Sequence, residues 1–264
     1  MLVRFTYLIV LGATCLSFLS GADVRPARAA SWTFGSNANG LTNLSSKTFL
    51  PVDAFKMNLS VNNPAGARFF ESDAAGLTVN STGLAGITDL EGADKINLLD
   101  VAGVPATAAE SVVFSFDTPG VLTGIDFDGV KDEALEFFIL TSSGGLRINF
   151  FDSFANTSIP GAVDDAAGQI TGDIIYLLET GSFDDEAQSL HIPFAAGQQF
   201  VVTYAELAPV AHPDYEMGNG ARLQGITVEA VPEPTTGVIS IGVALLISMR
   251  RRRRGHERQM QILC

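Results

Sequence analysis

The chain has 264 residues, and its 29 acidic against 16 basic residues give a formal net charge of −13. Such an acidic surface repels nucleic-acid phosphates and anionic lipid headgroups, which excludes nucleic-acid binding and leaves divalent cations or neutral polymers as partners. The only two cysteines, Cys15 and Cys264, lie in the terminal segments, so the sequence between them has no disulfide framework and no thiolate metal site.

Residues 1–29 predict a Sec-type signal peptide. Arg4 supplies its positive start, an apolar stretch follows, and Ala27-Arg28-Ala29 places small residues three and one positions before a cleavage site. We therefore expect the mature chain to begin at Ala30. A lipoprotein signal ending at Cys15 is the alternative, but the residues before this cysteine are poor ones for that cleavage.

Residues 30–230 predict one domain, because about 200 residues suffice for a single hydrophobic core. Between Ala30 and Pro234 seven basic residues stand against 27 acidic ones, which gives this part of the chain a formal charge of −20. An exported domain without cysteine depends on its core for stability.

Apolar and polar residues alternate in five short stretches of this domain, which is the period of a half-buried β-strand. The inward residues of these stretches are Val112, Phe114 and Phe116; Ile125 and Phe127; Leu146, Ile148 and Phe150; Leu190, Ile192 and Phe194; and Phe200, Val202 and Tyr204. Two further stretches, Leu135–Leu140 and Ile174–Leu178, are apolar on both faces and predict strands that are covered on each side.

Turn residues separate these stretches, and no long amphipathic pattern occurs. We therefore predict an all-β fold over residues 30–230, an antiparallel two-sheet β-sandwich of jelly-roll type. An N-terminal signal segment precedes it and one C-terminal hydrophobic helix follows it. Residues 31–48, 102–109 and 156–169 are rich in Ser, Asn, Ala and Gly and are expected to be loops.

An acidic stretch supplies the best candidate for ligand binding. Its four candidate metal ligands are Asp126, Asp128, Asp132 and Glu133. Asp126 and Asp128 are two residues apart in a predicted strand, so their side chains point to one face roughly 7 Å apart. Carboxylates of this kind, with turn carbonyls, are ligands for calcium, although the spacing is not that of an EF-hand. The alternative is that these acids are solvated, as we expect for the runs 164–165 and 184–186.

No catalytic residue is predicted, and we expect the protein not to be an enzyme. The chain has no Gly-x-Ser-x-Gly elbow and no His-Glu-x-x-His motif. His191 and His212 are interpreted as solvated. Trp32 follows the predicted cleavage site closely, and we expect it to pack the first strand on the core and not to stack on a sugar ring.

The C-terminal segment 231–254 has three parts: Val231–Pro234, the uncharged residues 235–249 and five arginines. Fifteen residues make about 22 Å of helix against a hydrocarbon core of about 30 Å, so the segment needs arginine side chains that reach the headgroups. Flanking arginines are retained on the cytoplasmic side, which places the domain outside. The alternative, a core helix with a basic tail, is disfavoured because residues 235–249 show no polar face. Residues 255–264 form a short tail.

This order of parts resembles the PEP-CTERM sorting signal of Gram-negative bacteria that make exopolysaccharide. The resemblance implies that a membrane-embedded exosortase recognises the Pro-Glu-Pro, removes the hydrophobic and basic tail and releases the protein to the cell surface or matrix. It implies recognition by Pro232, Glu233 and Pro234, and a cytoplasmic stop at Arg250, Arg251, Arg252, Arg253 and Arg254. The domain itself looks like other uncharacterised β-sandwich passengers of this signal, with no assigned activity.

We therefore expect an exported, non-enzymatic protein of the cell surface or extracellular matrix, whose precursor is held in the inner membrane through residues 235–249. Its expected partners are an exosortase-type enzyme, the membrane and exopolysaccharide, and no cofactor is expected. One alternative is a carbohydrate-binding module on exopolysaccharide, assisted by calcium. Another is an exported hydrolase.

Overall fold

The computed structural model describes residues 28–35, 39–72, 76–89, 95–101, 104–130, 136–152, 170–179, 184–187, 190–206 and 220–231. The chain divides into two units, and the unit Arg28–Ala230 carries all of the described strands. None of the described residues is helical, which agrees with the all-β prediction. The predicted signal segment and C-terminal helix lie outside the described residues.

The first layer of the unit contains seven hydrogen-bonded strands. Their order is β2 (Ser46–Thr48), β3 (Met57–Asn63), β9 (Ser111–Phe116), β16 (Gln199–Glu206), β11 (Glu136–Ser142), β12 (Arg147–Asp152) and β13 (Asp173–Glu179). The last pair, β12 with β13, is parallel, and the other pairs in this layer are antiparallel. The expectation of a purely antiparallel fold is therefore wrong at this one pair.

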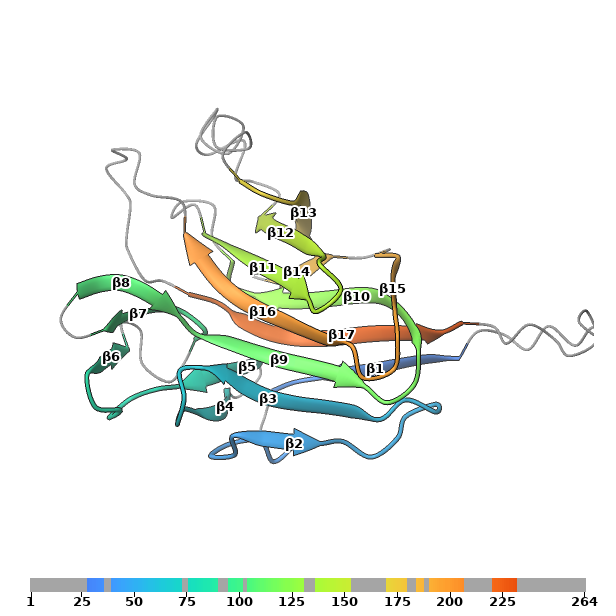
Figure 1. Cartoon of the computed structure of the whole chain (residues 1–264), viewed down its shortest axis with the longest axis horizontal. Helices are drawn as coiled ribbons and strands as arrows, with labels where there is room; N and C mark the ends of the chain where they lie inside the picture. The colour runs from blue at the N-terminus through green and yellow to red at the C-terminus, as the bar shows by residue number, and fades with distance from the viewer. Residues whose placement is uncertain are drawn as a thin grey trace, which may run out of the picture. The chain divides into compact units, whose positions relative to one another are not determined.

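The second layer is antiparallel and is centred on two nine-residue strands. Its order is β14 (Asp184–Ala187), β10 (Gly120–Asp128), β17 (Arg222–Ala230), β5 (Gly76–Asn80) and β4 (Arg68–Ser72), with β1 (Ala29–Thr33) beside β17 and β15 (Ile192–Phe194) beside β10. A separate small sheet consists of β6 (Ile87–Asp89), β7 (Leu98–Val101) and β8 (Val104–Ala109). Figure 1 shows the first layer passing over the second.

Backbone hydrogen bonds join the two layers along both sides. On one side β13 pairs with β14, so that Leu178 stands opposite Glu186. On the other side Asn43 donates its N–H to the carbonyl of Phe69 at 2.8 Å, and Phe69 donates to the carbonyl of Leu44 at 2.7 Å. Since Phe69 belongs to β4 and Leu44 lies two residues before β2, these bonds join β4 to the segment that leads into β2.

Aromatic rings fill the space between the layers. Phe116 of β9 has its ring centroid 5.4 Å from that of Trp32 in β1, 6.1 Å from Phe55 and 5.0 Å from Phe194 in β15. All four side chains are buried, which confirms that Trp32 is a core residue. The alternation in β9 therefore places its apolar face against the second layer, as the sequence predicts.

A second aromatic cluster joins the layers farther along β10. The ring of Phe127 stacks on that of Phe138 from β11 at 4.3 Å and lies 5.7 Å from Phe150 of β12. Phe138 in turn meets Tyr204 of β16 edge-on at 5.8 Å. Each ring is buried. Phe127, Phe150 and Tyr204 were predicted to be inward from period-two patterns, and Phe138 from a stretch that is apolar on both faces.

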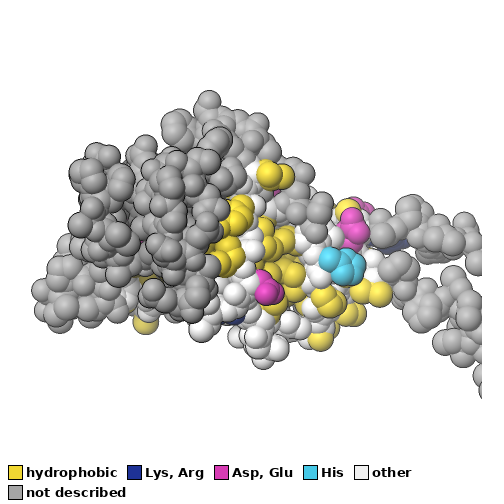
Figure 2. Space-filling model, turned by 90° about the horizontal axis from the view of Figure 1, so that it is seen from above, with side chains coloured by type: hydrophobic (Ala, Val, Ile, Leu, Met, Phe, Trp, Pro, Cys, Tyr) yellow, Lys and Arg dark blue, Asp and Glu magenta, His cyan; other side chains and the backbone are white. Residues whose placement is uncertain are grey.

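The two stretches that are apolar on both faces have different surroundings. In β11 both Phe137 and Phe138 are buried, and Phe137 stacks on Phe151 at 4.6 Å, so this prediction is confirmed. In β13, by contrast, the side chain of Leu178 is 57% exposed and Tyr176 is also exposed. The predicted cover on both faces of β13 is wrong, because this strand forms the seam between the layers. Figure 2 shows hydrophobic side chains on the described part of the face seen from above.

Two predicted loops contain strands. Residues 31–48 include part of β1 and all of β2, and residues 104–109 form β8. These strands are rich in Ser, Thr and Ala, which carry little of the hydrophobic alternation on which the prediction rested. Backbone pairing with a neighbouring strand defines them, and composition does not reveal it. The third predicted loop, residues 156–169, lies outside the described residues.

Substitution of Gly120 tests the packing between the layers. A Cβ added there would lie 2.7 Å from the carbonyl oxygen of Glu229, 2.8 Å from Cε1 of Phe55 and 2.9 Å from Cζ of Phe194. We predict that Gly120→Ala lowers the free energy of unfolding by about 2–3 kcal/mol, because backbone and two buried rings would have to move. Urea denaturation measures the change.

The matched control is Gly124→Ala on the same strand, where the nearest atom to an added Cβ is Cβ of Thr227 at 3.4 Å. We expect this variant to lose less than about 1 kcal/mol. Equal losses in the two variants would show that the close approach at Gly120 does not constrain the fold.

Candidate functional site

The chain enters and leaves the unit at one end of the second layer. Strand β1 pairs antiparallel with β17 over five residues, with Ala29 opposite Glu229. Beyond that pair, Ala230 donates its N–H to the carbonyl of Arg28 at 2.8 Å. Figure 1 shows the start of β1 and the end of β17 side by side. The predicted cleavage site and the residue that precedes Pro-Glu-Pro are therefore neighbours.

Of the predicted sorting signal, the structure describes one residue. Val231 follows β17 directly and is 51% exposed. The recognition residues Pro232, Glu233 and Pro234, the segment 235–249 and Arg250–Arg254 lie outside the described residues. In the part of the chain that is described, no helix is long and apolar enough to cross a membrane.

A hairpin tip, which we define as residues Leu50–Phe55, projects at this end. Val52 and Phe55 exchange both backbone hydrogen bonds, at 2.8 and 2.9 Å. Between them Asp53 and Ala54 have φ angles of 46° and 82°, the positive values that a type I′ hairpin turn requires. Ala54 is a strained residue there, at a cost of about 1–3 kcal/mol. Near the turn, the side chain of Leu50 is 85% exposed to solvent.

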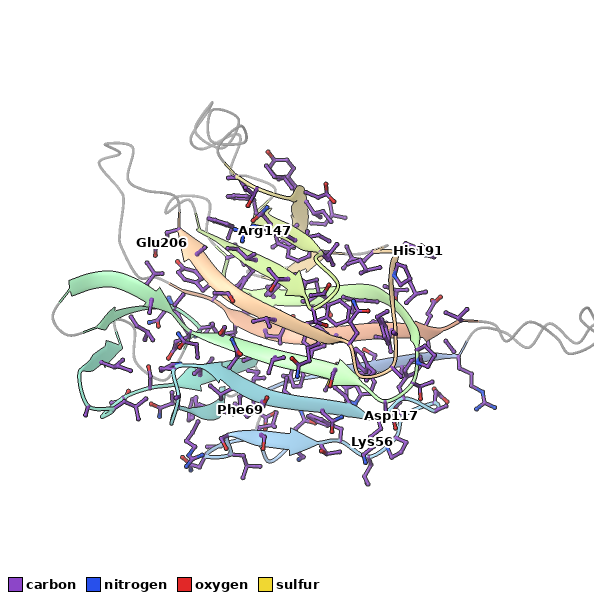
Figure 3. All side chains as sticks on the ribbon, viewed as in Figure 1. Lys56, Phe69, Asp117, Arg147, His191 and Glu206 are labelled. Carbon is purple, nitrogen blue, oxygen red and sulfur yellow. The ribbon has the colours of Figure 1, made fainter. Side chains whose placement is uncertain are left out.

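Contacts place the tip beside the point where the chain leaves the unit. The buried ring of Phe55 lies against Gly120, and Gly120 stands opposite Ala230 in the pairing of β10 with β17. The turn is also held by Thr118, whose hydroxyl donates to the carbonyl of Ala54 at 3.0 Å. Just beyond the tip, Lys56 donates its N–H to the carboxylate of Asp117 at 2.9 Å, and Figure 3 labels both residues.

The predicted calcium ligands lie at the opposite end of β10. Asp126 and Asp128 alternate with buried Ile125 and Phe127, as predicted. Asp128 is buried, however, and its Oδ2 accepts a hydrogen bond from Nη1 of Arg222 at 2.8 Å in an ion pair. The arginine already provides one positive charge to this carboxylate.

Close packing also limits the space around Asp126. A Cβ added at Gly225 would lie 2.5 Å from Oδ2 of Asp126, so the glycine makes room for this carboxylate. Asp132 and Glu133 lie outside the described residues. The proposed four-residue site is therefore described only for its two strand residues.

A second acidic run lies beside Asp126 and Asp128 in the sheet, although the two runs are far apart in the sequence. The run 184–186, expected to be a solvated loop, begins strand β14, and its backbone pairs with β10. Asp126 stands opposite Glu186, and Asp128 opposite Asp184. No local pattern predicts this register, because it depends on strands that are distant in sequence. Among the side chains that the structure describes, no three or more His, Cys, Asp or Glu form a metal site.

Two buried glutamates were not anticipated by the sequence analysis. Glu110 is fully buried, and its carboxylate accepts hydrogen bonds from Oγ of Ser81 at 2.6 Å and from N of Asn97 at 3.3 Å. Glu71 accepts from N of Leu41 at 3.0 Å and Nδ2 of Asn39 at 2.9 Å. Both carboxylates are bound to connecting segments, so they stabilise the fold.

His191 remains a surface residue. It is exposed immediately before β15, and it is the one histidine in the described ranges (Figure 3). Its exposure confirms the prediction of a solvated side chain. His212 lies outside the described residues.

The ion pair between Asp128 and Arg222 has a measurable role in stability. We predict that Arg222→Met lowers the free energy of unfolding by about 1–2 kcal/mol, because it leaves a buried carboxylate without its cation. The double variant Asp128→Asn/Arg222→Met should recover part of the loss, as measured by urea denaturation. An exposed control, Arg68→Met, should lose less; an equal loss would contradict a specific role for the pair.

The chain matches no protein-family model, no curated protein and no solved structure. Its function is therefore inferred from its own residues.

Proposed function

We propose that this protein is an exported, non-enzymatic component of the cell surface or extracellular matrix, sorted through a C-terminal PEP-CTERM signal. One observation carries the proposal: Val231–Pro234, the uncharged residues 235–249 and Arg250–Arg254 follow one another directly after the last strand. In this proposal the precursor is held in the inner membrane with the β domain outside. An exosortase-type enzyme then acts at Pro232, Glu233 and Pro234.

The position of the chain ends supports this route. Because β1 and β17 reach the same end of the unit, the segments that carry the N-terminal and C-terminal signals leave the domain together. A domain held at one end exposes the remainder of its surface to the environment. We also propose that the β domain has jelly-roll connectivity and that residues 235–249 form a membrane helix.

The pairing of β1 with β17 bears on when the signal peptide is removed. The predicted cleavage falls between Ala29 and Ala30, and both residues are paired with β17. Ala30 is also buried. A peptidase needs the scissile backbone in its own active site, so we propose that the signal peptide is removed before β1 pairs with β17.

Several polar side chains in the described part of the chain have structural roles. The buried Glu71 and Glu110 are engaged by hydrogen bonds to connecting segments. Asp128 is paired with Arg222, and His191 is exposed. These arrangements hold the fold together and do not form a nucleophile with an adjacent base.

The sorting signal can be tested by substitution of its central acid. We predict that Glu233→Ala leaves uncut precursor in the membrane, since the carboxylate is the one charged group in the proposed recognition motif. Fractionation and immunoblotting measure the ratio of precursor to mature protein. The matched control is Glu229→Ala, an exposed acid four residues earlier on β17, which should be processed normally. Equal processing of both variants would refute recognition at Glu233.

The arginines can be tested in the same assay. Deletion of Arg250–Arg254 should leave precursor uncut, because the cytoplasmic stop that sets the orientation is lost. Replacement of the five arginines by lysines should preserve processing, since the positive charge is retained. Normal processing of the deletion variant would contradict the assigned role of these residues.

A calcium-assisted carbohydrate-binding module on exopolysaccharide is the second candidate. The backbone register of β14 with β10 favours it, because it brings acidic positions of two strands to the same end of the second layer, and calcium is bound by carboxylates. A glycan array probed with the mature protein, with and without EDTA, separates the candidates. We predict no retention in either condition; binding that EDTA abolishes would favour the module instead.

A further inference from the structure

Three chemical groups that can react with one another meet beside strand β2. Lys47 of β2 donates a hydrogen bond from Nζ to the backbone carbonyl of Asn39. The side-chain amide of Asn39 donates from Nδ2 to Oε1 of Glu71 at 2.9 Å. Glu71 belongs to β4 and is only 3% exposed. An amine, a carboxamide and a buried carboxylate are therefore gathered around one residue, Asn39.

Hydrogen bonds fix the orientation of the Asn39 amide. Its Nδ2 also donates to the carbonyl of Thr33 at 2.9 Å, so both N–H groups of the amide are used. The carboxylate of Glu71 is held in turn, because its Oε2 accepts from the backbone N–H of Leu41 at 3.0 Å. The amide carbon, Cγ, is therefore held in place with its nitrogen against Glu71.

The surroundings of Lys47 bring its amine to the same place. Lys47 stands opposite Leu59 in the pairing of β2 with β3, which fixes its backbone. Its Nζ lies 5.3 Å from the centre of the buried ring of Phe49. A Cβ added at Gly40, the residue after Asn39, would lie 3.9 Å from Nζ. The amine is therefore a close neighbour of the residue whose amide carbon it can attack.

We propose that Lys47 and Asn39 become joined by an isopeptide bond, in a single reaction within the folded chain. Once the ammonium group of Lys47 has lost a proton to water, Nζ attacks Cγ of Asn39 and a new C–N bond forms. The bond between Cγ and Nδ2 breaks, and Nδ2 leaves as ammonia with one proton from Nζ. Atoms and charges balance without any oxidant or reductant.

Glu71 is the catalytic residue of this reaction, because its Oε1 contacts the nitrogen that leaves. A carboxylate within hydrogen-bond reach can accept a proton from Nζ and pass it to Nδ2. The fold supplies the remaining advantage, since it holds amine and amide together and makes the reaction intramolecular. The reaction occurs once in each molecule and acts on no external substrate. It is therefore compatible with a non-enzymatic protein and does not depend on the sorting signal.

An isopeptide bond would give the domain a covalent link that its composition otherwise denies it. Between Ala30 and Pro234 the chain has no cysteine, so no disulfide can form there. A bond between Lys47 and Asn39 closes a loop in the segment that leads into β2. Such a loop restricts the unfolded chain in the way that a disulfide does. Unlike a disulfide, an amide bond is not broken by thiols.

Mass spectrometry of the purified full chain tests the proposal. The bond lowers the mass of the chain by one molecule of ammonia, and it blocks trypsin after Lys47 because the amine has become an amide. We therefore expect a tryptic peptide that contains both Asn39 and Lys47 and ends at Lys56. An unlinked chain is cut after Lys47 instead. Fragmentation of the peptide should show that the two residues are joined.

Three variants separate the roles of the residues. Lys47→Arg keeps the positive charge but has no amine that can lose its proton, so it should retain the full mass. Glu71→Gln keeps the size of the side chain but cannot carry the proton, and it should contain at least about tenfold less linked chain after equal incubation. The matched control is Lys56→Arg, a half-buried lysine close to β2 in sequence, which should be linked as in the wild type. Thermal unfolding verifies that each variant is folded.

The wild-type chain decides whether the bond exists, even where a variant fails to fold. Full mass with cleavage after Lys47 would overturn the proposal. Loss of ammonia with cleavage after Lys47 would also overturn it, because this result indicates a succinimide between Asn39 and the backbone nitrogen of Gly40. Equal linkage in Glu71→Gln and the wild type would overturn the catalytic role of Glu71.

Discussion

The packing of Phe116 between the two layers is the contact on which the placement of the first strand and of the hairpin tip depends. Its ring lies next to Trp32 of β1, Phe55 of the hairpin tip and Phe194 of β15. One side chain of the first layer therefore sets the position of the first strand, the tip and the strand beside β10. Because the tip and the ends of the unit share this anchor, their proximity is a property of the core and does not depend on surface interactions.

The acidic character of the domain is divided between two structural roles. Glu71 and Glu110 lie in the interior, where hydrogen bonds from backbone and side chains offset the cost of burying a carboxylate. In the register of β10 with β14, acidic positions instead stand opposite one another at one end of the second layer, and there Arg222 pairs with Asp128. The net charge of the domain therefore does not indicate where its carboxylates lie. Proximity in sequence also does not predict which of them are neighbours in the structure.

The core strands could be predicted because one face of each is buried, which produces the alternation seen in Phe114 and Phe116 of β9 or Ile125 and Phe127 of β10. Strands β1, β2, β8 and β14 could not, since their residues are small or polar. The partners of β1 and β14 are distant in sequence, and β2 and β8 pair with the neighbouring strands β3 and β7. For the same reason the sequence identified Asp126 and Asp128 as outward residues but not the ion pair with Arg222. The hairpin tip was not predicted, because the exposed Leu50 belongs to no alternating pattern of apolar and polar residues.

The hydrogen bonds that join the layers, between β13 and β14 on one side and between Phe69 and residues 43–44 on the other, have a consequence for self-association of the protein. A strand with unsatisfied N–H and carbonyl groups is a template on which further copies can polymerise. At Leu178 and Glu179 on one side and at Phe69 on the other, such groups are already engaged within one molecule. The paired segments therefore offer fewer free backbone groups from which amyloid-like growth of the protein could start.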